Sequence, residues 1–595
     1  MTVRKVRRSQ IISPFGPGAI IDLVGESFVV EDAGKWRGPH APVVFPRLAS
    51  YLGVDSLASP SSRWPIPYFR FPQWMFCPAP KCRRMFRWSY HKEITNRAPT
   101  CERCPAAKKL IPMRFVAVCA NGHLADVDWR RWAHTPARRD RNQVQCEKLD
   151  LKFLNMANVG GGLNSLVVRC ETCGVERSLD GLTTRIGLSQ IGSKCSGRQP
   201  WQDQSDAETC SETVVAMQRG ASSVYFPTVE SAIDIPPESA WSTISDPLTA
   251  LKGSSEFKFL LGAPGHKLAQ KMIECAADEC GLTVAEVEAA LARELNDPTA
   301  PADGGPENIR PDEWAALINP QESHHHKDWF ISRRADRPLR ESTGDGGRWS
   351  QLIEDVVLVD RLREVRVLTH FERHTMQEKV PSNLSPDGDF LPAVEVFGEG
   401  FFLKFREDAL LKWEQLDLVT ARCQKLVERY EQKRLRWLSA PTPRYVLLHT
   451  FAHLLLRNTA FEAGYSTSSL RERLYVTKET AGPGMGGVLV YTAAGDSEGT
   501  LGGLVRMGEF PRLGRLIDMS IASARWCSFD PVCAEHPGQG PDALSLAACH
   551  ACSLTPETSC EATNRLLDRR LLIDPDFGFF RDVVSPDDRV PGRAL

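Results

Sequence analysis

The cysteines of this chain constrain its fold more than any other feature. There are 18 of them in 595 residues, and many stand in short pairs, such as Cys101 with Cys104 and Cys549 with Cys552. Two thiolates separated by two residues sit on one tight turn and can bind the same metal ion. The pattern therefore predicts small modules held together by metal, within a chain long enough for several domains.

The sequence around the cysteines favours thiols over disulfides. The N-terminal stretch "MTVRKVRRSQIISPFG" is basic, but no apolar run of signal-peptide length follows it. We find no stretch of about 18 to 20 apolar residues that could span a membrane. We therefore expect a cytoplasmic protein without a membrane partner, in which cellular reductants keep the cysteines reduced.

Three sets of four cysteines can be assembled from the spacing. The first set contains two close pairs, as in a zinc ribbon: Cys77, Cys82, Cys101 and Cys104. The second contains one close pair and two later residues: Cys170, Cys173, Cys195 and Cys210. The third lies near the C-terminus: Cys533, Cys549, Cys552 and Cys560, with Cys527 as an alternative fourth ligand. Four thiolates suit zinc or an iron–sulfur cluster, and the ribbon-like spacing without a dense ferredoxin-like run favours structural zinc.

Two further groups of residues leave their roles open. Cys119, His123, His134 and Cys146 either form another metal site or are packed polar residues. His449 and His453 lie one helical turn apart, as in metalloproteases, but Thr450 stands where the catalytic glutamate would be. We therefore expect the histidine pair to be core or interface residues.

The sequence contains no recognisable catalytic motif, but one group of residues is compatible with a catalytic metal site. Asp126 and Asp128, with Cys119 and His123, could hold a catalytic metal with an open position. This would make the chain a metal-dependent hydrolase or nuclease. We expect instead a protein that is not an enzyme and has no small-molecule substrate.

A basic cluster near the first cysteine set indicates contact with nucleic acid. It contains Lys81, Arg83, Arg84 and Arg87, interleaved with aromatic residues. Basic side chains bind phosphates and aromatic rings stack on bases, so we expect DNA-backbone contacts here. The alternative is a salt-bridged surface that never touches DNA, on a chain that acts only as a protein–protein adaptor. The net charge of −1 favours neither.

The order of segments predicts an α+β, multidomain fold with several small zinc-ribbon-like modules of four cysteines each and a helix-rich C-terminal half. We divide it into a strand-rich segment (1–75), a zinc-knuckle region (76–235), a helical segment with a linker (236–350), a mixed α/β core (351–510) and a C-terminal zinc module (511–595). Within the core, "EDALLKWEQLDLVTARCQKLVERYEQKRLRWLS" and "PRYVLLHTFAHLLLRNTAFEAG" predict long helices. "PAVEVFGEGFFLKF" predicts a hairpin that turns at 398–400.

Long motifs spread along the chain resemble one family. They include "RRSQIISPFGPGAIIDL", "RFVAVCANGHLADVDWRRW", "LLHTFAHLLLRNTAFEAGYSTSSLRERLY" and "AACHACSLTPETSCEATNRLLDR". These are similar to the DrmB family of the bacterial DISARM anti-phage defence systems, whose C-terminal part also occurs with superfamily 2 helicases. The resemblance implies a non-catalytic scaffold and DNA-binding subunit that partners the helicase-like subunit DrmA. It also places the family's C-terminal cysteines on Cys533, Cys549, Cys552 and Cys560.

Overall fold

The structure is a computed structural model, and two compact units make up its chain. It describes residues 8–61, 63–94, 97–135, 146, 148–156, 161–235, 257, 260, 269–280, 283–284, 287–288, 291, 309–320, 329–336, 346–374, 378–385, 390–433, 435, 437–477, 484–492 and 503–583. The N-terminal unit comprises residues 1–231 and 365–395, and the C-terminal unit comprises 232–364 and 396–595. The long strands β15 (Phe226–Ile233), β17 (Ile353–Glu372) and β19 (Phe390–Phe405) have residues in both units. The five segments expected from the sequence stay a finer prediction.

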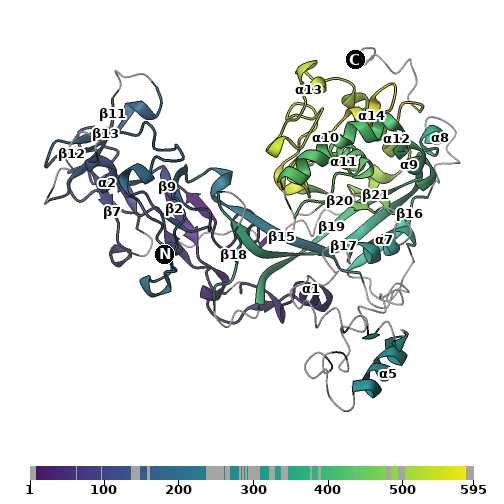
Figure 1. Cartoon of the computed structure of the whole chain (residues 1–595), viewed down its shortest axis with the longest axis horizontal. Helices are drawn as coiled ribbons and strands as arrows, with labels where there is room; N and C mark the ends of the chain where they lie inside the picture. The colour runs from purple at the N-terminus through teal and green to yellow at the C-terminus, as the bar shows by residue number, and fades with distance from the viewer. Residues whose placement is uncertain are drawn as a thin grey trace. The chain divides into compact units, whose positions relative to one another are not determined.

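Short strands in small sheets make up the N-terminal unit (Figure 1). The first two three-stranded sheets have the orders β1-β2-β5 and β7-β6-β8. Their strands are β1 (Ile20–Leu23), β2 (Glu26–Val30), β5 (Tyr68–Arg70), β6 (Trp74–Phe76), β7 (Met85–Arg87) and β8 (Ile111–Pro112). The two-residue strands β3 (Ala41–Pro42) and β18 (Val380–Pro381), β4 (Ser56–Ser59) and helix α1 (Pro46–Tyr51) complete this region.

Two more three-stranded sheets carry most of the cysteines of this unit. Their orders are β10-β9-β14 and β11-β12-β13, and all of the pairs are antiparallel. The elements are β9 (Phe115–Val118), β10 (Leu124–Asp126), α2 (Trp129–His134), β11 (Leu151–Asn155), β12 (Leu166–Cys170), β13 (Glu176–Ser178) and β14 (Val215–Gln218). Trp129 and Trp132 of α2 are fully buried against them. The two sheets and α2 share one apolar cluster, and a second cluster lies around Phe71 and Val116.

One larger sheet organises the C-terminal unit. In it β17, β19, β21 (Gly486–Thr492) and β20 (Leu470–Val476) are neighbours in that order, and β16 (Phe330–Arg334) pairs with β17. Side chains alternate between the two faces of a strand, and both faces of this sheet are covered. Phe401 and Leu403 belong to the core on one face, whereas Phe402 packs with Trp314 of helix α7 (Arg310–Ile318) on the other. This two-sided burial explains why the strands read as nearly continuous apolar runs.

Helix α11 (Pro443–Ala463) is the centre of the C-terminal core. It begins at Thr442, whose hydroxyl accepts a hydrogen bond from the Tyr445 N–H, and it ends at Gly464 in the left-handed conformation. Figure 1 shows α11 among neighbouring helices and beside β20 and β21, and residues 444–456 are buried on every side, whereas Phe461 near its C-terminal end is exposed. The remaining helices are α5 (Ala269–Cys280), α8 (Gly346–Trp349), α9 (Glu407–Glu414), α10 (Asp417–Lys433), α12 (Arg512–Ala524), α13 (Val532–Glu535) and α14 (Arg570–Ile573).

The structure confirms the α+β class, the cysteine-rich modules and the helix-rich C-terminal half. The two long helical stretches are confirmed as α9, α10 and α11. The hairpin expected at 398–400 is wrong, because β19 continues through it as one strand. A Cβ on Gly398 would lie 2.0 Å from the Thr492 carbonyl oxygen, so this glycine allows a close backbone approach rather than a turn. Among the described residues, no helix is long and apolar enough to cross a membrane.

Candidate metal centres

The first group, which we call the ribbon site, lies beside the β6–β7 hairpin. Cys77 follows β6, and Cys82 precedes β7 on a turn in which the Cys82 N–H donates to the Ala79 carbonyl (2.9 Å). Ligand atoms of Cys77, Cys82 and Cys104 all lie within 4.8 Å of one another, and the Cys82 and Cys101 sulfurs are 3.7 Å apart. The structure thus brings the four cysteines predicted for this set to one place.

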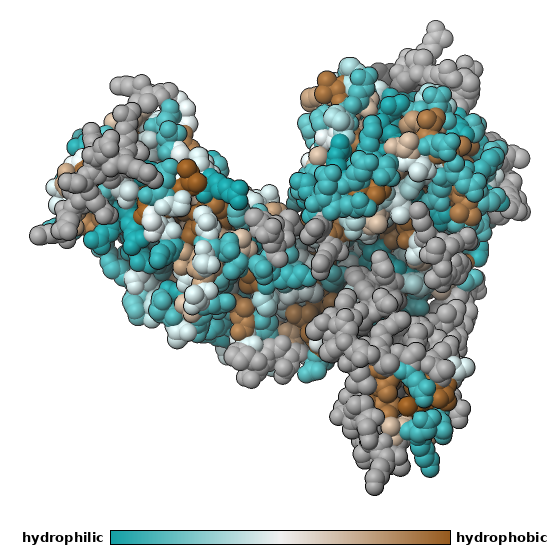
Figure 2. Space-filling model, viewed as in Figure 1, coloured by the Kyte–Doolittle hydropathy of each residue, from teal (hydrophilic) through white to brown (hydrophobic). Residues whose placement is uncertain are grey.

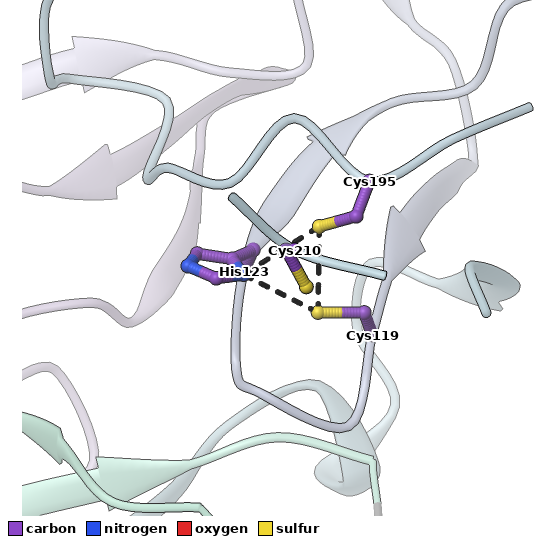
Figure 3. A group of neighbouring side chains, drawn as sticks. All are labelled: Cys119, His123, Cys195 and Cys210. Carbon is purple, nitrogen blue, oxygen red and sulfur yellow. Dashed lines mark hydrogen bonds between the residues drawn. The ribbon is translucent and has the colours of Figure 1, made fainter. Parts of the chain in front are cut away.

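The second group, the hairpin site, is built on the turn between β9 and β10 (Figure 3). Its members come from three parts of the chain: Cys119, His123, Cys195 and Cys210. The turn is closed by a hydrogen bond from the Gly122 N–H to the Cys119 carbonyl, and Gly122 has a φ of +76°. The Cys119 and Cys195 sulfurs each lie 3.5 Å from His123 Nδ1 and 3.5 Å from each other. Three sulfurs and one imidazole nitrogen are a typical zinc ligand set.

The surroundings of Cys119 favour its metal-binding form. The hydrogen bond from the Cys195 thiol and the adjacent His123 imidazole lower the pKa of the Cys119 thiol to about 4, against the opposing effect of burial. At neutral pH this sulfur is therefore a thiolate, the form that binds metal. Arg373, which is fully buried, donates from Nε to the Gly122 carbonyl (3.1 Å) and holds the turn in place.

The third group, the helix site, joins the end of α2 to the β12–β13 hairpin. Its members are His134, Cys146, Cys170 and Cys173. The Cys173 sulfur lies 3.4 Å from His134 Nε2, and the Cys146 and Cys170 sulfurs are 3.7 Å apart. His134 Nδ1 lies 2.7 Å from the Arg130 carbonyl, which fixes the tautomer with its proton on Nδ1 and leaves Nε2 for a metal.

The second cysteine set expected from the sequence is therefore not one group. Cys170 and Cys173 lie in the helix site, whereas Cys195 and Cys210 lie in the hairpin site. The close pair does lie on a tight turn, which the Gly174 N–H closes onto the Cys170 carbonyl (2.9 Å). Its partners come from residues upstream, which sequence spacing left open as another possible site. Residue spacing does not reveal which distant segments meet in the fold.

The fourth group, the C-terminal site, follows α12. Its members are Cys527, Cys533, Cys549 and Cys552. The Cys527 and Cys549 sulfurs are 3.5 Å apart, and the Cys533 sulfur lies 3.8 Å from that of Cys552. Asp530 shapes the first loop by accepting hydrogen bonds from the N–H groups of Cys527 (2.7 Å) and Ala534 (3.1 Å). Cys527, which the sequence offered as an alternative fourth ligand, is thus a member of this group, and Cys560 is not.

Cys560 belongs to a fifth, fully enclosed group with the helical histidine pair. We call it the buried site, and its members are His449, His453, Glu472 and Cys560. Glu472 was missed by sequence reasoning because a single glutamate has no diagnostic spacing. The available signal was its place in "LRERLYV", where charged residues interrupt a strand that is otherwise buried.

The aspartates of the alternative hydrolase site have structural partners. Asp126 accepts hydrogen bonds from the backbone N–H groups of Gln73 and Trp74, both at 3.2 Å. Asp128 caps α2 by accepting from the Arg131 N–H (3.0 Å). Burial raises the pKa of Asp126 to about 6, although the two N–H donors oppose this rise. Neither carboxylate belongs to the hairpin site that Cys119 and His123 form.

The four basic residues expected to bind DNA differ in their surroundings. Lys81 and Arg87 are exposed beside the ribbon site. Arg84 forms an ion pair with Asp150 (2.8 Å), and Arg83 is half-buried with its carbonyl accepting from the Phe153 N–H. Lys81 and Arg87 are thus the exposed members of the four.

Comparisons with known proteins cover most of the chain. A family model described as the MrfA Zn-binding domain matches residues 451–553, and one described as a domain of unknown function (DUF8724) matches residues 7–226. The DISARM protein DrmB of Bacillus paralicheniformis is 31% identical over 589 residues, which cover 93% of this chain and 97% of that protein. The chain belongs to the DrmB family.

The match to the MrfA Zn-binding domain indicates which metal the chain binds. The whole C-terminal site lies within the residues that match the MrfA Zn-binding domain, and this match together with the cysteine groups supports zinc binding. The sequence prediction of zinc is thereby confirmed for this DrmB-family chain. A crystal structure of the DUF1998 helicase MrfA bound to DNA aligns with 35% of this chain. The alignment covers 22% of the MrfA chain, at 12% sequence identity and with a TM-score of 0.17. A TM-score this low supports no inference about fold or function.

Proposed function

We propose that this chain is a non-catalytic, zinc-stabilised subunit of a DISARM defence complex, which binds a helicase-like subunit and DNA. Family membership supplies the defence context. The observation that carries the non-catalytic role is the composition of the metal groups. Each offers four protein ligands, and a zinc ion with four protein ligands has no open position for water or substrate. The two aspartates that could have made an open site are bound to backbone N–H groups instead.

DNA binding is proposed for the surface beside the ribbon site. Lys81 lies in the knuckle turn between Cys77 and Cys82, and Arg87 ends β7 on the same hairpin. Because the ribbon site fixes this turn, the two cations are held on a rigid support, which reduces the entropy lost on binding. Cations at such positions neutralise phosphates without reading sequence.

The test is DNA binding by the full chain carrying Lys81→Glu and Arg87→Glu together. We expect DNA affinity at low salt to fall about 10-fold or more, with a shallower salt dependence, because two phosphate contacts are lost. The matched control is Lys412→Glu with Lys425→Glu, two exposed lysines of α9 and α10 that change net charge equally. Equal loss of affinity in both double variants would show a general charge effect and contradict the proposed surface.

A second candidate function is a protein adaptor that never contacts DNA. It is favoured by large hydrophobic side chains exposed at and before α13, next to the C-terminal site: Trp526, Phe529 and Val532. Figure 2 shows hydrophobic surface where Figure 1 places α13. Clustered exposed aromatic residues are typical of protein interfaces. Replacing Trp526 and Phe529 by serine would then release the helicase-like subunit in a pull-down, while the Lys81 and Arg87 double variant would change nothing.

A further inference from the structure

The buried site differs from the four cysteine-rich groups in its ligands and its surroundings. His449 and His453 lie one turn apart on α11, Glu472 faces them from β20, and Cys560 arrives from a segment much later in the chain. Both histidines and the glutamate are at most 1% exposed, and Cys560 is 8% exposed. Because β20 alternates its side chains, Glu472 points toward α11 while Arg473 pairs with Glu313 on the other face.

The hydrogen bonds of the two imidazoles fix their orientation. His449 Nδ1 lies 3.2 Å from the Leu566 carbonyl, and His453 Nδ1 lies 2.8 Å from the Ser553 carbonyl. A carbonyl only accepts, so each ring carries its proton on Nδ1. Each Nε2 atom is then unprotonated, and its lone pair points to the interior of the site. Metal-binding histidines are typically held in this way by a backbone carbonyl behind the ring.

The atoms that meet inside the site are acceptors without enough donors. His449 Nε2 lies 3.2 Å from the Cys560 sulfur and 3.1 Å from Glu472 Oε1, and His453 Nε2 lies 3.4 Å from the same oxygen. His453 Nε2 and Glu472 Oε2 are both fully buried and have no hydrogen-bond partner. Unpaired buried polar atoms are costly, and a cation between them would satisfy both.

We propose that the buried site holds a structural zinc ion with two imidazole nitrogens, one carboxylate oxygen and one thiolate as ligands. Four tetrahedral ligands about 2.0–2.3 Å from zinc lie roughly 3.3–3.8 Å from one another. The four ligand atoms here lie within 4.8 Å of one another, and the closest pairs are at 3.1–3.4 Å. One carboxylate and one thiolate also balance the charge of a divalent cation, so the filled site is neutral in its apolar surroundings.

The same geometry argues against a catalytic cysteine–histidine pair. In such a pair the orienting acid contacts the ring nitrogen that faces away from the thiol. Here Glu472 and Cys560 both lie on the Nε2 side of His449, and a backbone carbonyl occupies the Nδ1 side. The thiol is also closed off from substrate. The site therefore acts as a staple that joins α11, β20 and the segment around Cys560.

This zinc is independent of the C-terminal site. Its ligands are shared with no other group of the described residues, and two of them, His449 and Cys560, lie outside the residues that match the MrfA Zn-binding domain. The inference also does not depend on the proposed function, since it concerns only what the chain binds in its interior.

The first test is the number of zinc ions in the full chain, measured by native mass spectrometry. We expect Cys560→Ser and Glu472→Gln each to bind one zinc fewer than the natural sequence, because each change removes one ligand at almost constant volume. The matched control is Thr459→Val, a buried and nearly isosteric change in the same helix, which should retain every zinc. An unchanged zinc count in both ligand variants would overturn the proposal.

A second measurement keeps the proposal testable if the variants do not fold. In crystals of the unaltered chain, anomalous scattering at the zinc absorption edge should give a peak enclosed by the four side chains of the buried site. Absence of that peak, with peaks present at the cysteine-rich groups, would show that these side chains form a metal-free polar network.

Discussion

In the N-terminal unit, three metal groups lie among sheets whose strands are two to five residues long, whereas in the C-terminal unit two groups flank a core built around a buried 21-residue helix. The described cores differ accordingly. The apolar cluster around α11 is much larger than the one that α2 shares with the sheets of the hairpin and helix sites, while the cluster on the second face of the β19–β21–β20 sheet is smaller than both. The candidate metal groups of the N-terminal unit thus stand beside a smaller core, and we expect metal to contribute a larger share of the stability there than in the C-terminal unit.

Removing metal should give the largest difference in stability between the two units. We expect a zinc chelator to make residues 70–220 sensitive to protease while the α11 region stays protected, because structural zinc contributes on the order of 10 kcal/mol to folding such modules. Limited proteolysis with mass spectrometry of the fragments measures the order of cleavage. A chelator already saturated with zinc is the control. Simultaneous cleavage of both units would show that the large core also depends on its metals.

The next largest effect is expected at Arg373, where the N-terminal unit uses a buried cation in place of apolar packing. Its guanidinium donates to the carbonyls of Gly122, Val224 and Gly18. Arg373→Met would remove the donor to the Val224 and Gly18 carbonyls, while the Gly122 carbonyl would keep only its hydrogen bond from the Gln199 side chain (2.9 Å), at a cost of about 3 kcal/mol. Hydrogen exchange of residues 115–126 should then accelerate, and zinc should leave the hairpin site more readily.

The control for this variant is Arg185→Met, an exposed position expected to change stability by less than about 0.5 kcal/mol. If the two variants exchanged hydrogen equally slowly, the guanidinium would not be supporting the metal turn.

The smallest expected effect concerns pH and the Asp126 carboxyl. Its pKa is raised to about 6 in the folded chain, against about 3.9 when unfolded. The folded state therefore binds the proton more tightly, and the resulting stabilisation is lost as the pH rises through 6. Between pH 5.5 and 7.5 the natural chain should lose about 1 kcal/mol relative to Asp126→Asn, as followed by urea unfolding at each pH. Parallel pH profiles for the two chains would contradict this assignment.

The sequence predicts the tight turns at the sites better than it predicts which residues come together in each metal group. Cys549 and Cys552, like Cys170 and Cys173, lie on tight turns, because a two-residue spacing determines a local geometry. The partners of such pairs come from elements distant in sequence, and only tertiary packing decides them. His134 is a member of its group because α2 ends beside the β12–β13 hairpin, a contact that no local pattern encodes.

The fold shows the same division between local and long-range information. Helix α10 follows from its apolar periodicity, whereas α11 follows from a long apolar run between two capping residues, Thr442 and Gly464. The continuous strand β19 was misread at Gly398 because glycine is equally suited to a turn and to close contact between backbones. The Thr492 carbonyl that decides between the two lies almost a hundred residues away.

The burial of α11 has a consequence for how the chain is made. Part of its surface is covered by α9 and α10, which precede it, but most of its contacts are with β20, β21, α12 and α14, all of which follow it in the chain. While the ribosome translates the residues that follow α11, this helix lacks most of the elements that cover it, and exposed apolar surface associates with other chains. We therefore expect any truncation before the end of α14 to leave part of the α11 surface exposed, and the nascent chain to need chaperone protection until these residues are made.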